Sequence, residues 1–390
     1  MHRQDRYLTV VLSGAAGEPC EELDGKTPLQ AAPTPHLDAL AAEAEVGCAE
    51  LPETADPSRP ETSIAVLLGV EPTSLPHGPL LAAAMEFRPE EQDVCFRCEF
   101  VATDGDTLLG PTGALPEQQE RALVGLVQEK LSTRRLRVIP GNGSPHLLLW
   151  TDGPRDLECC PPELARGLPL RRALPRGDGE EVLRRFVDDC LNLLYGHPVN
   201  RARAGEGLPP ANLLWPYENG TLPKLRPFGI EWGMTAGLVA AVPEVRGLGC
   251  LLGMHVADPG RVETDYDAAL AQCLNLLQSH RFVLLHVPSC RAARNRGDAT
   301  EVAYTLRDMD TRLIAPLREL QAASRLCLML VCDEAKRSRA PMLYLLSPRK
   351  AMSVQPPFDE RLAAEDGVAR LAAAALLSKL LKPTSLLSDL

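Results

Sequence analysis

Short apolar runs alternate with longer amphipathic stretches in this chain. Residues 7–12 (YLTVVL), 282–287 (FVLLHV) and 327–332 (CLMLVC) are apolar runs of strand length, which is typical of strands buried on both faces. Between the last two runs, a helical periodicity predicts a helix over 299–320, with its apolar positions at Val302, Leu306, Met309, Leu313 and Leu317. Strands that alternate with helices predict an α/β fold with a mostly parallel sheet sandwiched by helices.

The middle of the chain has a different pattern. Short alternating segments predict strands over 94–102, 135–139 and 147–150, and they are mixed with expected helices over 115–131 and 179–194. This mixture predicts a smaller α+β domain inserted into the larger one, and the Gly- and Pro-containing stretch 201–210 marks the return to it. We therefore expect an inserted domain over 78–207 and a discontinuous larger domain made of 1–77 and 208–390.

Three predicted strands of the larger domain end in polar loops. The first ends at Ser13-Gly14, the second is followed by 289–295, and the third ends at Asp333-Glu334. Because ligands collect beyond the carboxyl ends of parallel strands, we expect these loops to converge on one site. The Ala- and Leu-rich tail, 371–390, predicts a terminal helix that closes the core, with a dimer contact as the alternative.

Composition and charge exclude some classes of function. The 390 residues are 45% hydrophobic, and 41 basic against 52 acidic residues give a net charge of −11. Nucleic acid is therefore not an expected partner, because phosphate backbones are bound by clustered positive charge. No apolar run reaches the roughly 20 residues that cross a bilayer, and the first residues resemble no signal peptide. We expect a cytoplasmic protein that does not bind membranes.

The 12 cysteines are scattered through apolar runs, which favours buried thiols over a disulfide framework. Cys95 and Cys98 have the spacing of a redox motif, but the alternation through Val94 and Phe96 predicts a strand. No second pair completes a tetrahedral zinc site. The adjacent Cys159 and Cys160 are expected in a loop.

Several phrases of the chain resemble the archaeal type of cofactor-independent (2,3-bisphosphoglycerate-independent) phosphoglycerate mutase, of the alkaline phosphatase superfamily. Their shared order over most of the chain indicates membership more strongly than any one phrase. They are 25–29 (GKTPL), 34–38 (TPHLD), 67–72 (LLGVEP), 78–80 (GPL), 96–98 (FRC), 197–200 (HPVN), 211–216 (ANLLWP), 237–242 (GLVAAV), 247–249 (GLG), 253–254 (GM) and 264–266 (TDY).

The resemblance implies an alkaline-phosphatase-like domain interrupted by a transferase-like domain. It also implies interconversion of 2-phosphoglycerate and 3-phosphoglycerate through a phosphoserine. Two divalent ions, Mn or Mg, assist that reaction in the family by stabilising charge on the attacking and leaving oxygens.

Most of the family's ligand positions carry other residues here. Ser13 occupies the position where the family has a metal-binding Asp. The position of the family's nucleophilic serine aligns with Pro60, or with Thr62 if the alignment contains a gap. Thr62 or the adjacent Ser63 is a candidate nucleophile, whereas a helix-capping hydroxyl is the simpler interpretation of Thr62. The remaining substituted positions are Arg291, Asn295, Glu334 and Glu163.

Few acids remain as candidate metal ligands, and they are Asp333, Glu334 and Glu61. Arg97 matches a family arginine and is a candidate for binding an anionic substrate, with a salt bridge to Glu99 or Asp104 as the alternative. Arg291 and Arg294 would repel a metal ion, but guanidinium groups bind phosphate well. A solvated basic loop is the alternative for these two arginines.

Three hypotheses follow. The first, which we favour, is a pseudoenzyme of the family that needs no cofactor and binds a phosphorylated small metabolite or a protein partner. The second is an active metal-dependent phosphoglycerate mutase or a related phosphotransferase, for example one that acts on homoserine. The third is a protein that functions through its surface, in a complex with another enzyme of central carbon metabolism.

Overall fold

The computed structural model describes residues 5–257, 260, 265–334, 340–348 and 357–381. The chain divides into two compact units, Ser74–Lys224 and the discontinuous pair Met1–Thr73 and Leu225–Leu390. The smaller unit therefore extends beyond the expected 78–207. The extension contains a strand, β9 (Leu213–Gly220), which pairs along β3 (Val94–Thr103) inside the smaller unit.

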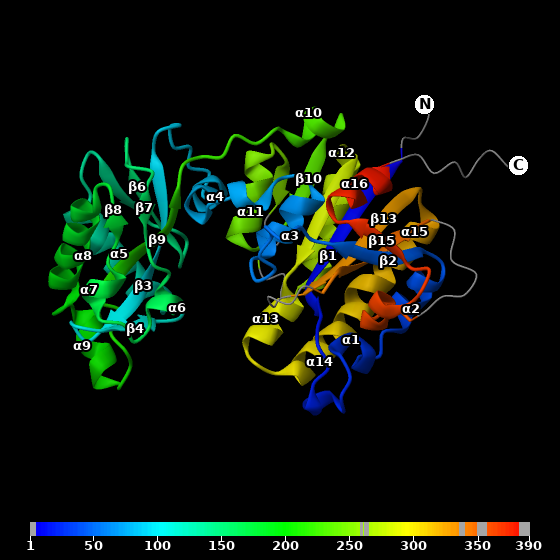
Figure 1. The fold of residues 1–390 in the computed structure, drawn as a ribbon, viewed down its shortest axis with the longest axis horizontal. Coiled ribbons are helices and arrows are strands. Elements are labelled where there is room, and N and C mark those ends of the chain that lie inside the picture. The colour runs from blue at the N-terminus through cyan, green and yellow to red at the C-terminus, as the bar shows by residue number, and fades with distance from the viewer. Residues whose placement is uncertain (1–4, 258–259, 261–264, 335–339, 349–356, 382–390) are drawn as a thin grey trace, which may run out of the picture. The chain divides into compact units, whose positions relative to one another are not determined.

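The larger unit is built on an eight-stranded sheet with the order β11-β10-β12-β1-β13-β14-β2-β15 (Figure 1). Among its described strands, β14 alone runs against the others. The mostly parallel α/β sheet predicted from the apolar runs is therefore confirmed. Its strands are β1 (Arg6–Ala16), β2 (Glu45–Glu50), β10 (Ala236–Val239), β11 (His255–Ala257), β12 (Phe282–Val287), β13 (Leu326–Glu334), β14 (Met342–Ser347) and β15 (Ala369–Ala372).

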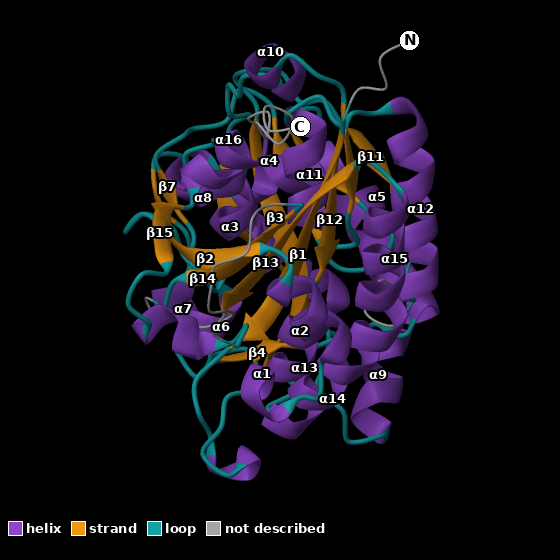
Figure 2. Ribbon diagram, turned by 90° about the vertical axis from the view of Figure 1, so that its right-hand side faces the viewer, coloured by secondary structure: helices purple, strands orange, loops and turns teal. Residues whose placement is uncertain are grey.

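Helices cover both faces of this sheet (Figure 2). Two adjacent residues of β10 contact helices on opposite faces of the sheet. Gly237 packs closely against Leu276 of α12, and Leu238 packs closely against Gly249 of α11. The helices of this unit are α1 (Pro28–Ala31), α2 (Pro35–Ala42), α3 (Pro60–Leu67), α10 (Phe228–Trp232), α11 (Pro243–Leu251), α12 (Tyr266–Ser279), α13 (Ser289–Asn295), α14 (Ala299–Met309), α15 (Ala315–Ala323) and α16 (Ala374–Leu381). Short 3-10 turns occur at η1 (Glu21–Leu23), η2 (Pro72–Ser74) and η4 (Glu360–Ala364).

The helix predicted over 299–320 contains a π-helical turn, η3 (Asp310–Ile314), between α14 and α15. All five apolar positions of the prediction are buried. The π turn lies where buried Asp310 accepts the backbone N–H groups of His36 (3.1 Å) and Leu37 (2.8 Å) at the start of α2. Asp310 thus caps α2, because the side chain of Thr34 at the N-cap position makes no capping bond.

The smaller unit contains an antiparallel sheet in which β3 pairs with β4, β6 and β9, and β5 pairs with β6. Helices α5 and α8 pack over one face in a core with Phe96 and Trp215, and α4 packs on the other face against Cys95. The other elements are α4 (His77–Ala84), β4 (Leu108–Pro111), α5 (Glu117–Leu131), β5 (Leu136–Ile139), β6 (His146–Trp150), β7 (Leu157–Glu158), α6 (Pro162–Ala165), α7 (Leu170–Ala173), β8 (Arg176–Gly177), α8 (Glu180–Leu194) and α9 (Pro198–Gly205).

The 12 cysteines are free thiols, of which seven are buried as predicted and five are partly buried. Cys95 faces α4 and Cys98 faces the α5 and α8 side of β3, so the two thiols point away from each other. Burial raises the pKa of Cys95 to about 12 and the pKa of Cys98 well above its usual value. Neither thiol therefore has the thiolate character that a redox motif needs.

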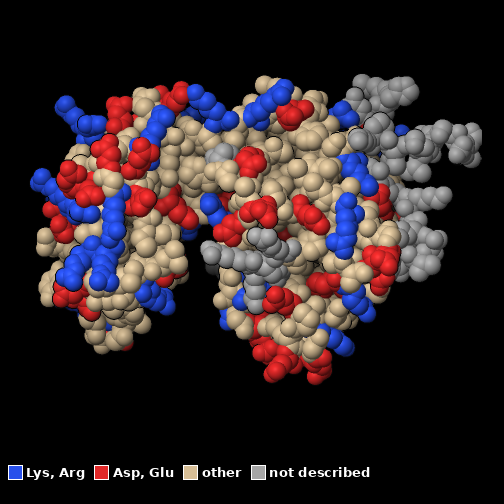
Figure 3. Space-filling model, in the orientation of Figure 1, with Lys and Arg blue, Asp and Glu red and all other residues tan. Residues whose placement is uncertain are grey.

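Charge is mixed on the surface, and the visible face of each unit carries both Lys or Arg and Asp or Glu (Figure 3). Among the helices in the described segments, none combines the length and the apolar character needed to span a bilayer.

His146 is a fully buried imidazole in the core of the smaller unit. The Gly141 N–H donates to His146 Nδ1 (3.1 Å), so Nδ1 carries no proton. His146 Nε2 lies 3.3 Å from a carboxylate oxygen of Glu120, whose pKa is raised by burial. Burial lowers the pKa of His146 to about 4.

This imidazole gives the smaller unit a stability that depends on pH. In the unfolded chain His146 binds a proton below its ordinary pKa of about 6.5, while the folded chain keeps it neutral down to about pH 4. The contribution of neutral His146 to stability is therefore present above pH ~6.5 and is lost as the pH falls toward 4. Between pH 7 and pH 5 the loss is about 2 kcal/mol.

Urea unfolding of the wild type and of His146→Asn at both pH values measures this term, because Asn keeps an acceptor for Gly141 and does not titrate. We expect the variant to lose about 2 kcal/mol less than the wild type between pH 7 and pH 5. Equal losses in the two proteins would contradict this assignment.

Candidate functional site

The polar loops converge at the carboxyl ends of β1, β12 and β13, as the sequence predicts. Ser13 lies in β1, Arg291 lies in α13 directly after β12, and Asp333 lies in β13. The three side chains are almost completely buried. Ser13 Oγ accepts a hydrogen bond from Arg291 Nε (2.9 Å) and donates one to Asp333 Oδ2 (3.3 Å).

Asp333 is surrounded by hydrogen-bond donors. Its Oδ1 accepts the Gly14 N–H (2.7 Å) and lies 3.6 Å from Arg291 Nη2. Its Oδ2 accepts the hydroxyl of Ser63 (2.7 Å) as well as that of Ser13. A carboxylate has about four lone-pair sites, so these three hydrogen bonds occupy most of the acceptor capacity of Asp333, and the ion pair with Arg291 balances its charge.

Arg291 is held by its neighbours on every nitrogen. In addition to Ser13, its Nη1 donates to the carbonyls of Pro57 (3.1 Å) and Ser58 (3.0 Å), and its Nη2 donates to the Pro57 carbonyl (3.1 Å). With its side chain paired to Asp333, this guanidinium is an internal cation and not a residue of a solvated loop. The phosphate-binding role predicted for Arg291 would require it to give up these bonds.

Of the two candidate nucleophiles, Ser63 is the one that reaches Asp333. Both residues lie in the first turns of α3 and are buried. The hydroxyl of Thr62 instead donates to the carbonyls of Asp56 (2.6 Å) and Arg59 (2.8 Å), which fixes the chain entering the helix. Pro60 is the first residue of α3 and has no side-chain hydrogen-bonding group.

The bond from Ser63 to Asp333 should contribute measurably to stability, because hydrogen bonds to buried charged groups are the stronger ones. We expect Ser63→Ala to lower the free energy of unfolding by about 2 kcal/mol. Ser58→Ala is the matched control, since the exposed Ser58 hydroxyl bonds only to Asp56 within its own turn, and it should change stability by about 0.5 kcal/mol or less. Equal effects in urea unfolding would contradict the assignment.

The remaining predicted site residues of the larger unit lie in different surroundings. Glu61 is fully buried and pairs with Arg59 Nε (2.8 Å). Arg294 donates to the carbonyls of Gly14 (3.0 Å) and Ala16 (2.9 Å), and so holds the end of β1. Asn295 is exposed at the end of α13, and the side chain of Glu334 lies outside what the structure describes.

Two site predictions fall in the smaller unit. The guanidinium of Arg97 lies 5.8 Å from the ring centre of Tyr217, whose hydroxyl donates to Glu99. Burial raises the pKa of Glu99, while Tyr217 and the Arg97 charge act to lower it. The charge of Arg97 therefore acts on Glu99, and both roles predicted for Arg97, the salt bridge and the binding of an anionic substrate, stay predictions. Glu163 is exposed in α6.

Ser13, Ser63, Arg291 and Asp333 form a cluster at the carboxyl ends of the strands, here called the rim, and some other groups at this rim could not be found from the sequence. The N–H of Gly14 and the carbonyls of Pro57 and Ser58 belong to the backbone and leave no signature in the side chains. His286 of β12 is fully buried, and burial lowers its pKa to about 4, while the charge of Asp333 acts in the opposite direction. The sequence marked His286 only as part of an apolar run.

The family resemblance implies two divalent ions at this site. Such ions need carboxylate oxygens and imidazole nitrogens as acceptors. The groups that converge on Asp333 are two hydroxyls, a backbone N–H and a guanidinium, which are used here as donors. Across the described residues, no three His, Cys, Asp or Glu side chains gather so that they could hold a metal ion. As arranged, these residues do not fit the ions.

Comparison with known proteins identifies relatives over most of the chain. A family model described as 2,3-bisphosphoglycerate-independent phosphoglycerate mutase matches residues 41–200. A probable enzyme of that name from Geobacter sulfurreducens is 32% identical over 324 residues, which cover 80% of this chain and 81% of the relative. The enzyme of that name from Methanopyrus kandleri is 32% identical over 350 residues, covering 80% and 79%.

Solved structures share the fold. A protein from Pyrococcus horikoshii superposes with a TM-score of 0.79 at 21% identity, over 97% of this chain and 96% of its own. The cofactor-independent phosphoglycerate mutase from Thermoplasma acidophilum superposes with a TM-score of 0.65 at 24% identity, over 97% and 99%. These similarities confirm the predicted alkaline-phosphatase-like fold.

Proposed function

The chain belongs to the 2,3-bisphosphoglycerate-independent phosphoglycerate mutase family, and we propose that it is a member without mutase activity, a pseudoenzyme that binds a phosphorylated metabolite or a protein partner. The observation that carries the proposal is the guanidinium of Arg291 bonded to Ser13 and paired with Asp333. A permanent cation therefore lies beside Asp333, one of the three acids that remain as candidate metal ligands.

Electrostatic magnitudes support this proposal. Two unit charges of the same sign 4 Å apart repel by roughly 4 kcal/mol at an effective dielectric constant of 20, so a divalent ion would be repelled by roughly 8 kcal/mol. The single negative charge of Asp333 is cancelled by Arg291, and position 13 carries a serine in place of the family's Asp, so no net negative charge is left among these residues to attract a divalent ion. The rim is already neutralised by Arg291.

The ligand is proposed from two further arginines. Arg97 is half-buried in the smaller unit and matches a family arginine, and Arg294 borders the rim loop. Either guanidinium suits an anionic metabolite. A protein partner, with no role for nucleic acid or membrane, and a cytoplasmic location are the remaining parts of the proposal.

One observation favours the second candidate function, an active phosphotransferase of the same family, with glycerate phosphates or a substrate such as homoserine. The Ser63 hydroxyl donates to Asp333 at 2.7 Å, as a nucleophilic hydroxyl does to the base that activates it. Ser63 is 2% exposed, however, and its partner also carries the charge of Arg291.

Mass spectrometry and turnover distinguish the two functions. The chain is incubated with 3-phosphoglycerate and Mn²⁺ or Mg²⁺, 2-phosphoglycerate is followed by ³¹P NMR, and the peptide containing Ser58 to Ser63 is analysed. We expect no turnover and an unmodified peptide, with a Thermoplasma-type mutase as the positive control. Turnover that disappears in Ser63→Ala, together with a phosphorylated Ser63, would establish the active enzyme instead.

A further inference from the structure

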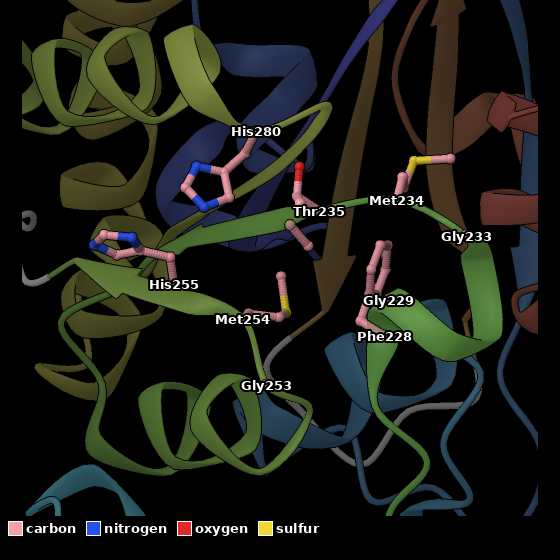
Figure 4. Close-up of a pocket in the computed structure, with 10 residues that line it drawn as sticks. Phe228, Gly229, Gly233, Met234, Thr235, Gly253, Met254, His255 and His280 are labelled. Carbon is pink, nitrogen blue, oxygen red and sulfur yellow. The ribbon is translucent and has the colours of Figure 1, made fainter.

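A second pocket lies at the edge of the large sheet where the parallel strands β10, β11 and β12 begin, and it has a volume of about 630 Å³. This edge is opposite the rim. Figure 4 shows the side chains of Phe228 and Met254 on either side of the pocket, with His255 and His280 at one end. Its lining residues all belong to the larger unit.

Apolar side chains form one wall of this pocket. Phe228 of α10 stacks on Phe282 of β12 with ring centres 4.9 Å apart, which fixes the helix against the sheet. Ile230 is two residues further along α10 and is 64% exposed, and Met234 lines the pocket after the end of this helix. An apolar wall with an exposed isoleucine on the same helix favours an apolar occupant over an ion or a phosphate group.

Helix α16 ends at this same edge of the sheet. At its start, the Ala373 N–H donates to the carbonyl of Glu50, the last residue of β2 (2.9 Å). In its last turn, Lys379 pairs with Glu45, the first residue of β2. The helix therefore runs back along β2, and the chain leaves α16 at Leu381, at the edge where the parallel strands begin.

The end of α16 and the pocket also share one face of the sheet. Helix α3 packs against both α16 and α11, so these helices cover the same face. The pocket is tied to the end of α11, because the Phe228 N–H donates to the carbonyl of Leu252 (2.8 Å), and Gly253 and Met254 of the lining follow directly.

Residues 382–390 are long enough to reach the pocket. Helix α16 packs against β13, which is three strand positions from β10. Neighbouring strands are about 4.8 Å apart, so the lateral distance is roughly 14 Å, and an extended chain covers about 3.3 Å per residue. Leu386 and Leu387 are five and six residues beyond Leu381 and fall within this range.

We propose that the segment 382–390 docks onto this pocket, with Leu386 and Leu387 as its apolar contacts. A tethered segment binds at a high effective concentration, so a modest apolar contact is enough to hold it. Docked in this way, the segment covers the pocket and closes it to other proteins. The site has no residue in common with the rim and does not depend on the function proposed for that rim.

Methyl NMR of the full chain, labelled with ¹³C at the methyl groups of methionine and leucine, tests this contact directly. We expect nuclear Overhauser effects between the methyl groups of Met234 or Met254 and those of Leu386 or Leu387. The double variant Leu386→Ser with Leu387→Ser should lose them and should shift the signals of both methionines, because their apolar neighbours are removed. Ser385→Ala is the matched control in the same segment and should leave both signals in place.

Two results would overturn the proposal. The first is that the Met234 and Met254 signals are the same in the wild type and in the double variant. The second is that these signals shift with protein concentration, which would place a second copy of the chain in the pocket. The methyl signals of the other methionines report that each variant is folded.

Discussion

Replacing Arg291 by Met should lower the free energy of unfolding of the larger unit by about 4 kcal/mol, because removing one partner of a buried ion pair leaves the other charge without compensation. Asp333 is 1% exposed, and Arg291 is its paired cation. The variant also leaves the carbonyls of Pro57 and Ser58 without the donors that they have in the wild type. Urea unfolding followed by fluorescence measures the loss.

The double variant Arg291→Met with Asp333→Asn tests the reason for this loss. If the buried charge of Asp333 causes the instability, removing it should recover at least about half of the lost free energy, and the two substitutions should not be additive. Arg296→Met is the matched control on the same loop, because Arg296 pairs with Glu301 at the surface. An effect of Arg291→Met as small as that of Arg296→Met would show that Arg291 is not the counter-charge.

Gly14→Ala should destabilise the larger unit by about 3 kcal/mol. Gly14 has φ +77°, and a Cβ at this position would lie 2.7 Å from the backbone nitrogen and Cα of Arg291. The positive φ costs an L-residue about 1–2 kcal/mol, and the steric overlap with rigid backbone adds about 1–3 kcal/mol. Relief of the overlap would displace α13 and with it Arg291.

Gly25→Ala separates these two contributions. Gly25 has a similar φ of +73°, but nothing lies within 4 Å of its Cβ position. It should therefore show only the backbone cost of about 1–2 kcal/mol. Thermal and urea unfolding of both variants give the difference, and equal destabilisation would contradict the close approach between β1 and α13.

The sequence predicted the buried strands and helices because the burial of an element determines the spacing of its apolar residues. The runs over 7–12, 282–287 and 327–332 became β1, β12 and β13, since strands buried on both faces need continuous apolar residues. The convergence of Ser13 and Asp333 followed from the parallel direction of these strands. The π turn at Asp310 was not predicted, because its cause is a distant bond to the start of α2.

The hydrogen-bond partners at the rim could not be predicted from the pattern of side chains along the sequence. Consecutive residues on a helix point about 100° apart, so a shift of one residue decides whether Thr62 or Ser63 faces Asp333. The predicted tail helix is present as α16, and residues 382–390 lie outside the described residues. The partners that hold Arg291 are mainly backbone carbonyls, so its role as an internal cation emerged only from the structure.

The central claim is that Arg291 supplies the positive charge at this rim, and equilibrium binding of Mn²⁺, counted by electron paramagnetic resonance, tests it most directly. At millimolar free Mn²⁺ we expect no stoichiometric ion whose binding depends on Asp333, and the same result for the wild type and for Asp333→Asn. Two Mn²⁺ ions per chain that are lost in Asp333→Asn would contradict the account.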